Sequence, residues 1–219
     1  MELKHPYPTV TTARGVRYGG DQRLSGDAVL RRCGCGVIAA TDLLRYLSHW
    51  HDGCRIPALT AMEEGGAPTQ AQYDELTRRL RRYFPLLYPT GINGLGLALG
   101  LNRVFRRWGI PYTARWGVPH TVLFERMAAQ LRLDLPVILA VGPSFPRLWQ
   151  RERLAMRRCD TGCETGVRAH FMTVTALDET YLTVSSWGGR YRIRHSDLSL
   201  YLRRHSSALV TNLIWLQPK

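Results

Sequence analysis

The stretch "CGCGVIAATDLLRYL", residues 33–47, joins two closely spaced cysteines to an apolar segment with a helical period. Apolar side chains recur on one stripe from Val37 to Leu47, so the pattern predicts a buried helix over 36–50. Cys35 stands where this stripe begins. At a helix N-terminus, unpaired N–H groups and the helix dipole favour the thiolate form of a cysteine. The thiol has three possible roles: a nucleophile, an inert core residue, or one half of a metal-binding pair.

Outward from this helix, the first half of the chain is mostly helical and the second half is mostly extended. Further helices are expected over 70–84, 91–109 and 119–134, with an amphipathic stretch over 195–205. Strands are expected over 110–117, 135–142, 169–178, 180–194 and 208–217. Helices followed by an antiparallel sheet favour an α+β fold, which we expect to form a single domain over 1–219.

Three stretches carry no regular pattern. Residues 1–27 are rich in Gly, Pro and Thr, and we expect them to form an extended arm. Residues 51–68 contain "GGAP" and are expected to be a loop. Residues 143–166 are expected to form a long irregular loop insertion that shapes specificity beside the strand that follows.

Composition limits the class of protein. The N-terminus lacks an apolar signal segment and no stretch is long and apolar enough to span a bilayer, so a cytoplasmic location is expected. Five cysteines make an odd number, which favours reduced thiols over a disulfide framework. The formal net charge is +13 and lysine occurs only at Lys4 and Lys219. The arginines are scattered, so this charge does not favour nucleic acid as a partner.

A nucleophilic cysteine needs a base, and the base needs a group that orients it. His170 opens the strand 169–178 and is the candidate base. The chain turns and returns as the strand that follows, so a residue about fifteen places later comes back beside the histidine. This hairpin brings Ser185 or Ser186 within reach of the imidazole, where a hydroxyl could hold one tautomer.

Two motifs, "CGVIAATDLLRYL" (35–47) and "HFMTVTALDETYLTVSSWGG" (170–189), together resemble those of papain-like cysteine peptidases. The likeness is greatest to the branch that includes bacteriocin-leader (double-glycine) peptidases, and it covers roughly residues 30–215 in order. It implies a papain-like fold with a central helix packed on a C-terminal antiparallel sheet. It also implies hydrolysis of a peptide, isopeptide or other amide bond, with Cys35 as nucleophile and His170 as general acid and base. No cofactor or metal is implied, and the partner would be a peptide, a protein or an amide-containing small molecule.

The chain departs from this family at two positions. The family usually places an amide side chain five or six residues before the nucleophile, where this chain has "AVLRR" (28–32). Gln22 is the nearest amide side chain, and a looped arm could deliver it as an oxyanion donor. "SSWG" (185–188) puts Ser185 where the family carries an amide or a carboxylate. These departures favour the rival hypothesis of a catalytically inactive papain-like protein, whose arginine-rich surface binds an acidic partner or nucleic acid.

The remaining cysteines raise an alternative of a different class. Cys159 and Cys163 lie four residues apart, and Cys33 with Cys35 forms a second close pair, so four thiolates could bind zinc. A Cys-x-Cys pair is an unusual half-site, and zinc would also consume the candidate nucleophile. A redox contact between Cys33 or Cys163 and the active thiol is a further alternative.

Overall fold

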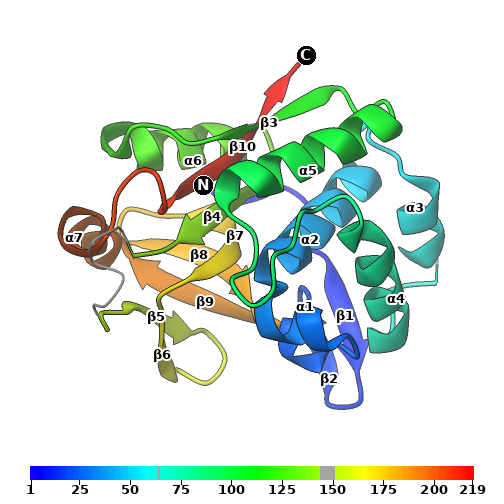
Figure 1. Cartoon of the computed structure of the whole chain (residues 1–219), viewed down its shortest axis with the longest axis horizontal. Helices are drawn as coiled ribbons and strands as arrows, with labels where there is room; N and C mark the ends of the chain where they lie inside the picture. The colour runs from blue at the N-terminus through cyan, green and yellow to red at the C-terminus, as the bar shows by residue number, and fades with distance from the viewer. Residues whose placement is uncertain (64, 144–150) are drawn as a thin grey trace.

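An antiparallel sheet forms the centre of the protein in the computed structural model, which describes residues 1–63, 65–143 and 151–219 (Figure 1). Within these residues the sheet has eight strands, and every pairing in it is antiparallel. In spatial order the strands are β3 (Tyr112–Trp116), β10 (Asn212–Pro218), β4 (Val137–Val141), β7 (His170–Leu177), β8 (Tyr181–Ser186), β9 (Gly189–Arg194), β5 (Leu154–Arg158) and β6 (Glu164–Val167). The expectation of an α+β fold is therefore confirmed.

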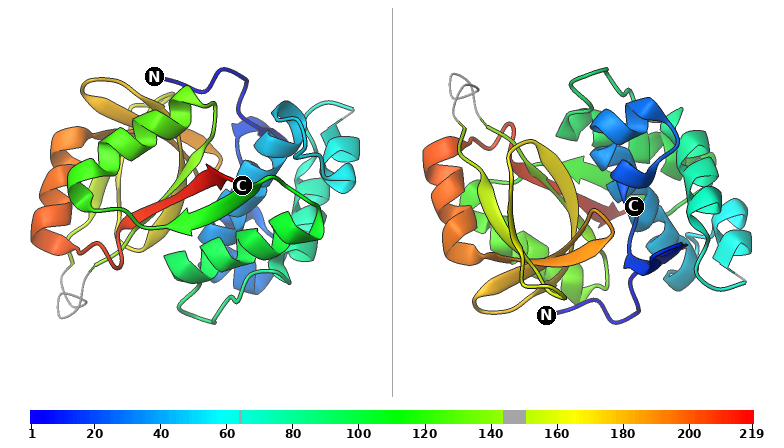
Figure 2. Two further views of the ribbon diagram at one scale, coloured as in Figure 1. Left: turned by 90° about the horizontal axis from the view of Figure 1, so that it is seen from above. Right: turned by 90° about the horizontal axis from the view of Figure 1, so that it is seen from below.

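Helices cover the sheet in two groups, which lie on opposite sides of it in the views of Figure 2. The first group comprises α1 (Ala28–Cys33), α2 (Cys35–Trp50), α3 (Pro57–Glu63), α4 (Gln70–Arg81) and α5 (Gly94–Arg107). The second comprises α6 (Leu123–Arg132) and α7 (His195–His205). Each group packs on the sheet through its own apolar cluster. The sheet therefore separates two cores, one on each face.

Helix α2 is the central helix of the first group. It confirms the helix expected over 36–50, and it is buried continuously from Gly36 to Ser48. It packs on β7 and β4 and on the neighbouring helices α3, α4 and α5. Since protein surrounds it, its polar residues as well as its apolar stripe lie in the interior.

The three stretches without a regular pattern contain more structure than we expected. The arm over 1–27 is not extended throughout: it forms the hairpin β1 (Thr9–Thr12) and β2 (Gly15–Tyr18), followed by a 3-10 turn, η1 (Gln22–Leu24). The loop over 51–68 contains helix α3. The insertion over 143–166 carries the hairpin of β5 and β6, while its residues 144–150 lie outside the described residues.

The short strands among these corrections were missed for one physical reason. Strands of four or five residues are too short for their alternation to stand out in the sequence. Strand β5 forms at an edge of the main sheet, where it adds to β9 through the pairs of Arg157 with Arg192 and of Arg158 with Tyr191, whereas β1 and β2 pair with each other in a separate two-stranded sheet.

The start of helix α4 agrees with the start of the helix expected over 70–84. Thr69 begins α4 through a capping box in which its hydroxyl accepts the Gln72 N–H and Gln72 bonds back to the Thr69 N–H. The second 3-10 turn, η2 (His120–Val122), precedes α6 inside the helix expected over 119–134. In the described parts of the chain, no helix has both the length and the apolar character that a membrane span needs.

Candidate functional site

Cys35 and His170 line the same small pocket, although 135 positions separate them in the chain. Cys35 begins α2 and His170 begins β7, and these two elements pack against each other. A wider groove is also lined by both residues, together with Gly91, Val210 and others. The pair predicted from sequence is therefore brought together at a site with an opening.

Glycine permits this close approach of helix and sheet. A Cβ on Gly36 would lie 2.8 Å from Ile92 Cγ2 and 3.2 Å from Phe171 Cδ2, closer than side chains tolerate. Without that Cβ, the first turn of α2 lies directly beside the residue that follows His170. Gly34 joins the two helices, because it is both the C-cap of α1 and the N-cap of α2.

The thiol of Cys35 is partly exposed at the pocket, but protein surrounds it on the remaining sides. Burial raises the pKa of this thiol, while hydrogen bonds from the backbone N–H groups of Phe171 and Gly36 act in the opposite direction. The helix N-terminus therefore lowers the thiol pKa in the expected direction, but burial is the larger effect and the pKa of Cys35 is raised overall.

His170 is buried, and its ring is held on two sides. Its Nε2 lies 2.8 Å from Ser186 Oγ, and its ring centroid lies 4.5 Å from that of Trp187. The pKa of His170 is lowered to about 4, mainly by burial and also by the charge of Arg23, while the charge of Asp21 acts in the opposite direction. At neutral pH both the imidazole and the thiol are therefore uncharged, and the pair does not rest as thiolate and imidazolium.

Of the two serines, Ser186 is the one that contacts the histidine. A shift in the pairing of β7 with β8 between Val174 and Ala176 sets the register, and Ser185 lies opposite Thr173. Ser185 Oγ instead donates to the carbonyl oxygen of Tyr18 at 3.0 Å. The expectation that Ser185 could orient His170 is corrected: Ser185 anchors the N-terminal hairpin, and its neighbour bonds the ring.

The N-terminal segment carries Gln22 to the site. Gln22 lines both the pocket and the wider groove together with Cys35. Its side-chain amide donates to the carbonyl oxygen of Arg31 at 3.2 Å. Backbone bonds hold the loop before it, since Gly188 N–H donates to Gly20 O and Gly20 N–H donates to a carboxylate of α2.

That carboxylate belongs to Asp42, a pocket residue that the sequence reasoning missed. Asp42 Oδ2 accepts the Gly20 N–H at 2.8 Å, and Oδ1 accepts the Tyr73 hydroxyl at 3.0 Å. Its sequence signal was weak because it falls off the apolar stripe, where a solvent-facing residue is expected. Burial raises the pKa of Asp42 to about 6, although Arg45 and these two hydrogen bonds lower it.

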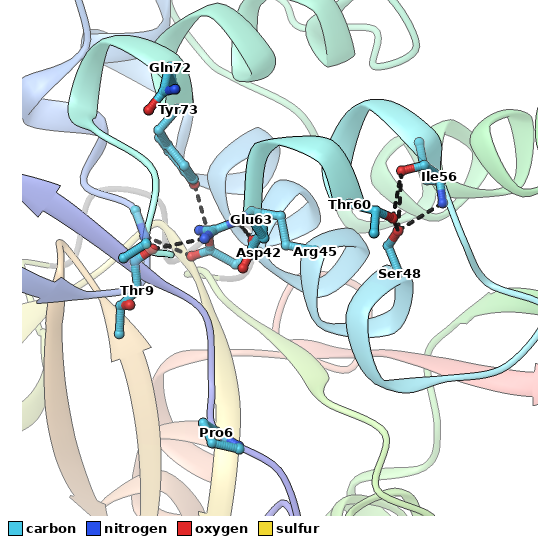
Figure 3. Close-up of polar contacts among 12 residues, drawn as sticks. Pro6, Thr9, Asp42, Arg45, Ser48, Ile56, Thr60, Glu63, Gln72 and Tyr73 are labelled. Atoms are coloured by element: carbon cyan, nitrogen blue, oxygen red, sulfur yellow. Dashed lines mark hydrogen bonds and ion pairs between the residues drawn. The ribbon is translucent and has the colours of Figure 1, made fainter. Parts of the chain in front are cut away.

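Arg45 connects this carboxylate to the helices around it, as Figure 3 shows. The guanidinium lies 3.5 Å from Asp42, donates to Glu63 at 2.5 Å and donates to the Thr9 carbonyl at 2.8 Å. These contacts join α2, α3 and the N-terminal hairpin beneath the pocket. The network thus fixes the segment that carries Gln22 relative to the helix that carries Cys35.

The four thiols considered for zinc do not gather at one place. Cys33 lies in the groove beside Cys35, and its thiol donates to Val29 O at 3.2 Å. Cys159 and Cys163 are exposed on the β5–β6 hairpin. In residues 1–63, 65–143 and 151–219, no three His, Cys, Asp or Glu side chains come together as they would to hold a metal ion.

Comparison with known proteins finds no match: no family model, no curated protein and no solved structure is similar to this chain.

Proposed function

We propose that this protein is a papain-like cysteine hydrolase that cleaves a peptide, isopeptide or other amide bond. The observation that carries the proposal is the small pocket that Cys35, at the start of α2, shares with His170, at the start of β7. The groove that reaches this pocket offers space for an extended chain. The five free cysteines support a reducing compartment, and we propose the cytoplasm.

The chemistry begins from a neutral pair. In the tautomer whose Nε2–H donates to Ser186 Oγ, Nδ1 of His170 is unprotonated and would accept the thiol proton as the sulfur attacks the substrate carbonyl. The oxyanion would receive hydrogen bonds from the Cys35 N–H and from Gln22, once the amide of Gln22 turns from Arg31. His170 would then give its proton to the leaving amine, and water would hydrolyse the thioester and regenerate the thiol.

The first test measures alkylation of Cys35 by iodoacetamide at pH 7, with each modified cysteine mapped by mass spectrometry. If His170 acts as a base, Cys35 is alkylated faster than Cys33, and His170→Ala slows it by at least about tenfold, at the low end of general-base effects. Ser186→Ala should slow the reaction, whereas the matched variant Ser185→Ala should leave the rate near that of wild type. Labelling of Cys35 that does not respond to His170→Ala would refute the assignment.

The second test measures turnover. The wild-type protein is incubated with a mixture of peptides, and new termini are identified by mass spectrometry. Cleavage should be absent in Cys35→Ala, a variant that keeps a small apolar side chain at that position. The same products from wild type and Cys35→Ala would refute Cys35 as the nucleophile, and no products from either would favour the inactive binding protein.

A further inference from the structure

Strand β9 presents a row of arginines on one face. In "GRYRIR" (189–194), Arg190, Arg192 and Arg194 are exposed, while Tyr191 and Ile193 between them are buried. Alternate residues of a strand lie on the same face, about 6.6–6.8 Å apart. The three guanidinium groups therefore project from one side of the sheet.

Strand β5 pairs with β9 and adds a further arginine beside this row. Arg157 of β5 lies directly opposite Arg192 of β9. Like charges in directly opposed positions destabilise a sheet. Arg157 donates to the carbonyl oxygen of Gly162, and Arg192 lies over the ring of Tyr181. Across the described parts of the chain, no carboxylate forms an ion pair with either of them.

The surface around these residues is hollowed. One hollow of about 370 Å³ is lined by Arg157, Arg158, Cys159 and Arg192 among others. A second hollow shares Arg158 and Cys159 with the first and continues past Arg190 towards β2. We call the surface formed by Arg157, Arg190, Arg192 and Arg194 the β9 arginine face. Arg158 lies opposite Tyr191 and pairs with Asp160, so it is not part of this face, and Arg190 at its end pairs with Glu2.

We propose that the β9 arginine face binds an extended acidic polypeptide segment. The spacing of its arginines equals the spacing of alternate side chains in an extended peptide, so every second residue of the ligand can meet one guanidinium. The guanidinium group bonds a carboxylate through two parallel N–H donors. An acidic side chain would also relieve the repulsion between Arg157 and Arg192.

Two observations favour a polypeptide over nucleic acid. Guanidinium groups cover the rings of Tyr18 and Tyr181, so these rings do not offer open faces on which bases stack. Glu164 and Asp197 line an adjoining hollow, where they would repel a continuous chain of phosphates. A peptide can place uncharged residues beside those two carboxylates.

The test measures the fluorescence anisotropy of a labelled twelve-residue peptide of alternating Glu and Ala. The variant Arg157→Gln/Arg192→Gln should bind it at least tenfold more weakly than wild type. Arg106→Gln/Arg107→Gln removes the same charge from exposed positions at the end of α5, and it should bind within twofold of wild type. Since the first variant removes opposed like charges, its melting temperature should not fall below that of wild type.

A second readout locates the ligand. Cys159 is exposed and lines both hollows, whereas Cys163 is exposed nearby but lines neither. Bound peptide should slow maleimide alkylation of Cys159 more than that of Cys163. Equal loss of binding in both double variants, or no binding by wild type, would overturn the proposal. Tighter binding of a dT12 oligonucleotide, with the same protection of Cys159, would assign the face to nucleic acid. The Cys35→Ala variant should bind the peptide as wild type does, so this result does not depend on hydrolysis.

Discussion

The buried carboxylate of Asp42 offers a quantitative test of the network beneath the pocket, through the substitution Asp42→Asn. The amide has nearly the same volume as the carboxyl group but does not titrate. In the native protein the two oxygens of Asp42 accept bonds from Gly20 and Tyr73, and Arg45 lies 3.5 Å away. The difference in unfolding free energy between the two proteins therefore isolates the titration of this one group.

The expected pH dependence follows from the two pKa values of Asp42, about 6 in the folded protein against the ordinary 3.8. Since the folded pKa is the higher one, folding takes up a proton between these values. The contribution of Asp42 to stability is full below pH 3.8 and is lost as the pH rises through 6. Between pH 4 and pH 7 the loss is about 2 kcal/mol, from roughly 1.4 kcal/mol for each pKa unit.

The assay is urea unfolding followed by tryptophan fluorescence at pH 4, 5, 6 and 7. The unfolding free energy of wild type minus that of Asp42→Asn should fall by about 2 kcal/mol across this range. The control Asp52→Asn removes an exposed carboxylate just after α2, and an equal change for this variant would mean that the effect is not specific to the buried site. A difference that stays flat for Asp42→Asn, or rises with pH, would refute the reasoning, because attraction to Arg45 would then outweigh burial.

Two further variants test the surroundings of the site. Arg23→Gln removes a positive charge that lowers the pKa of His170, so this pKa should rise above about 4 in an NMR titration of the ring; an unchanged value would rule out the charge effect. Gly20→Ala puts a Cβ onto the hydroxyl of the buried Tyr73, and it should destabilise the protein by about 1–3 kcal/mol in urea unfolding. Gly65→Ala meets no atom within 4 Å and serves as the control; equal effects of the two substitutions would contradict the packing argument.

The sequence alone determined the elements with strong local signals. Apolar periodicity predicted the central helix, and the helix expected over 70–84 begins at Gln70 as predicted. The histidine-led hairpin was predicted from alternation and turn residues, to within one residue of the serine that bonds His170. These features could be predicted from the sequence because each depends on residues only a few positions away in the chain.

Only the tertiary structure decided which side chains meet at the pocket. The irregular register of β7 with β8 selected Ser186 over Ser185, and packing on all sides buried Asp42. Burial also set the direction of the pKa shift of Cys35 against the local effect of the helix N-terminus. Desolvation and strand register depend on atoms that the chain brings from distant positions, so no local pattern in the sequence encodes them.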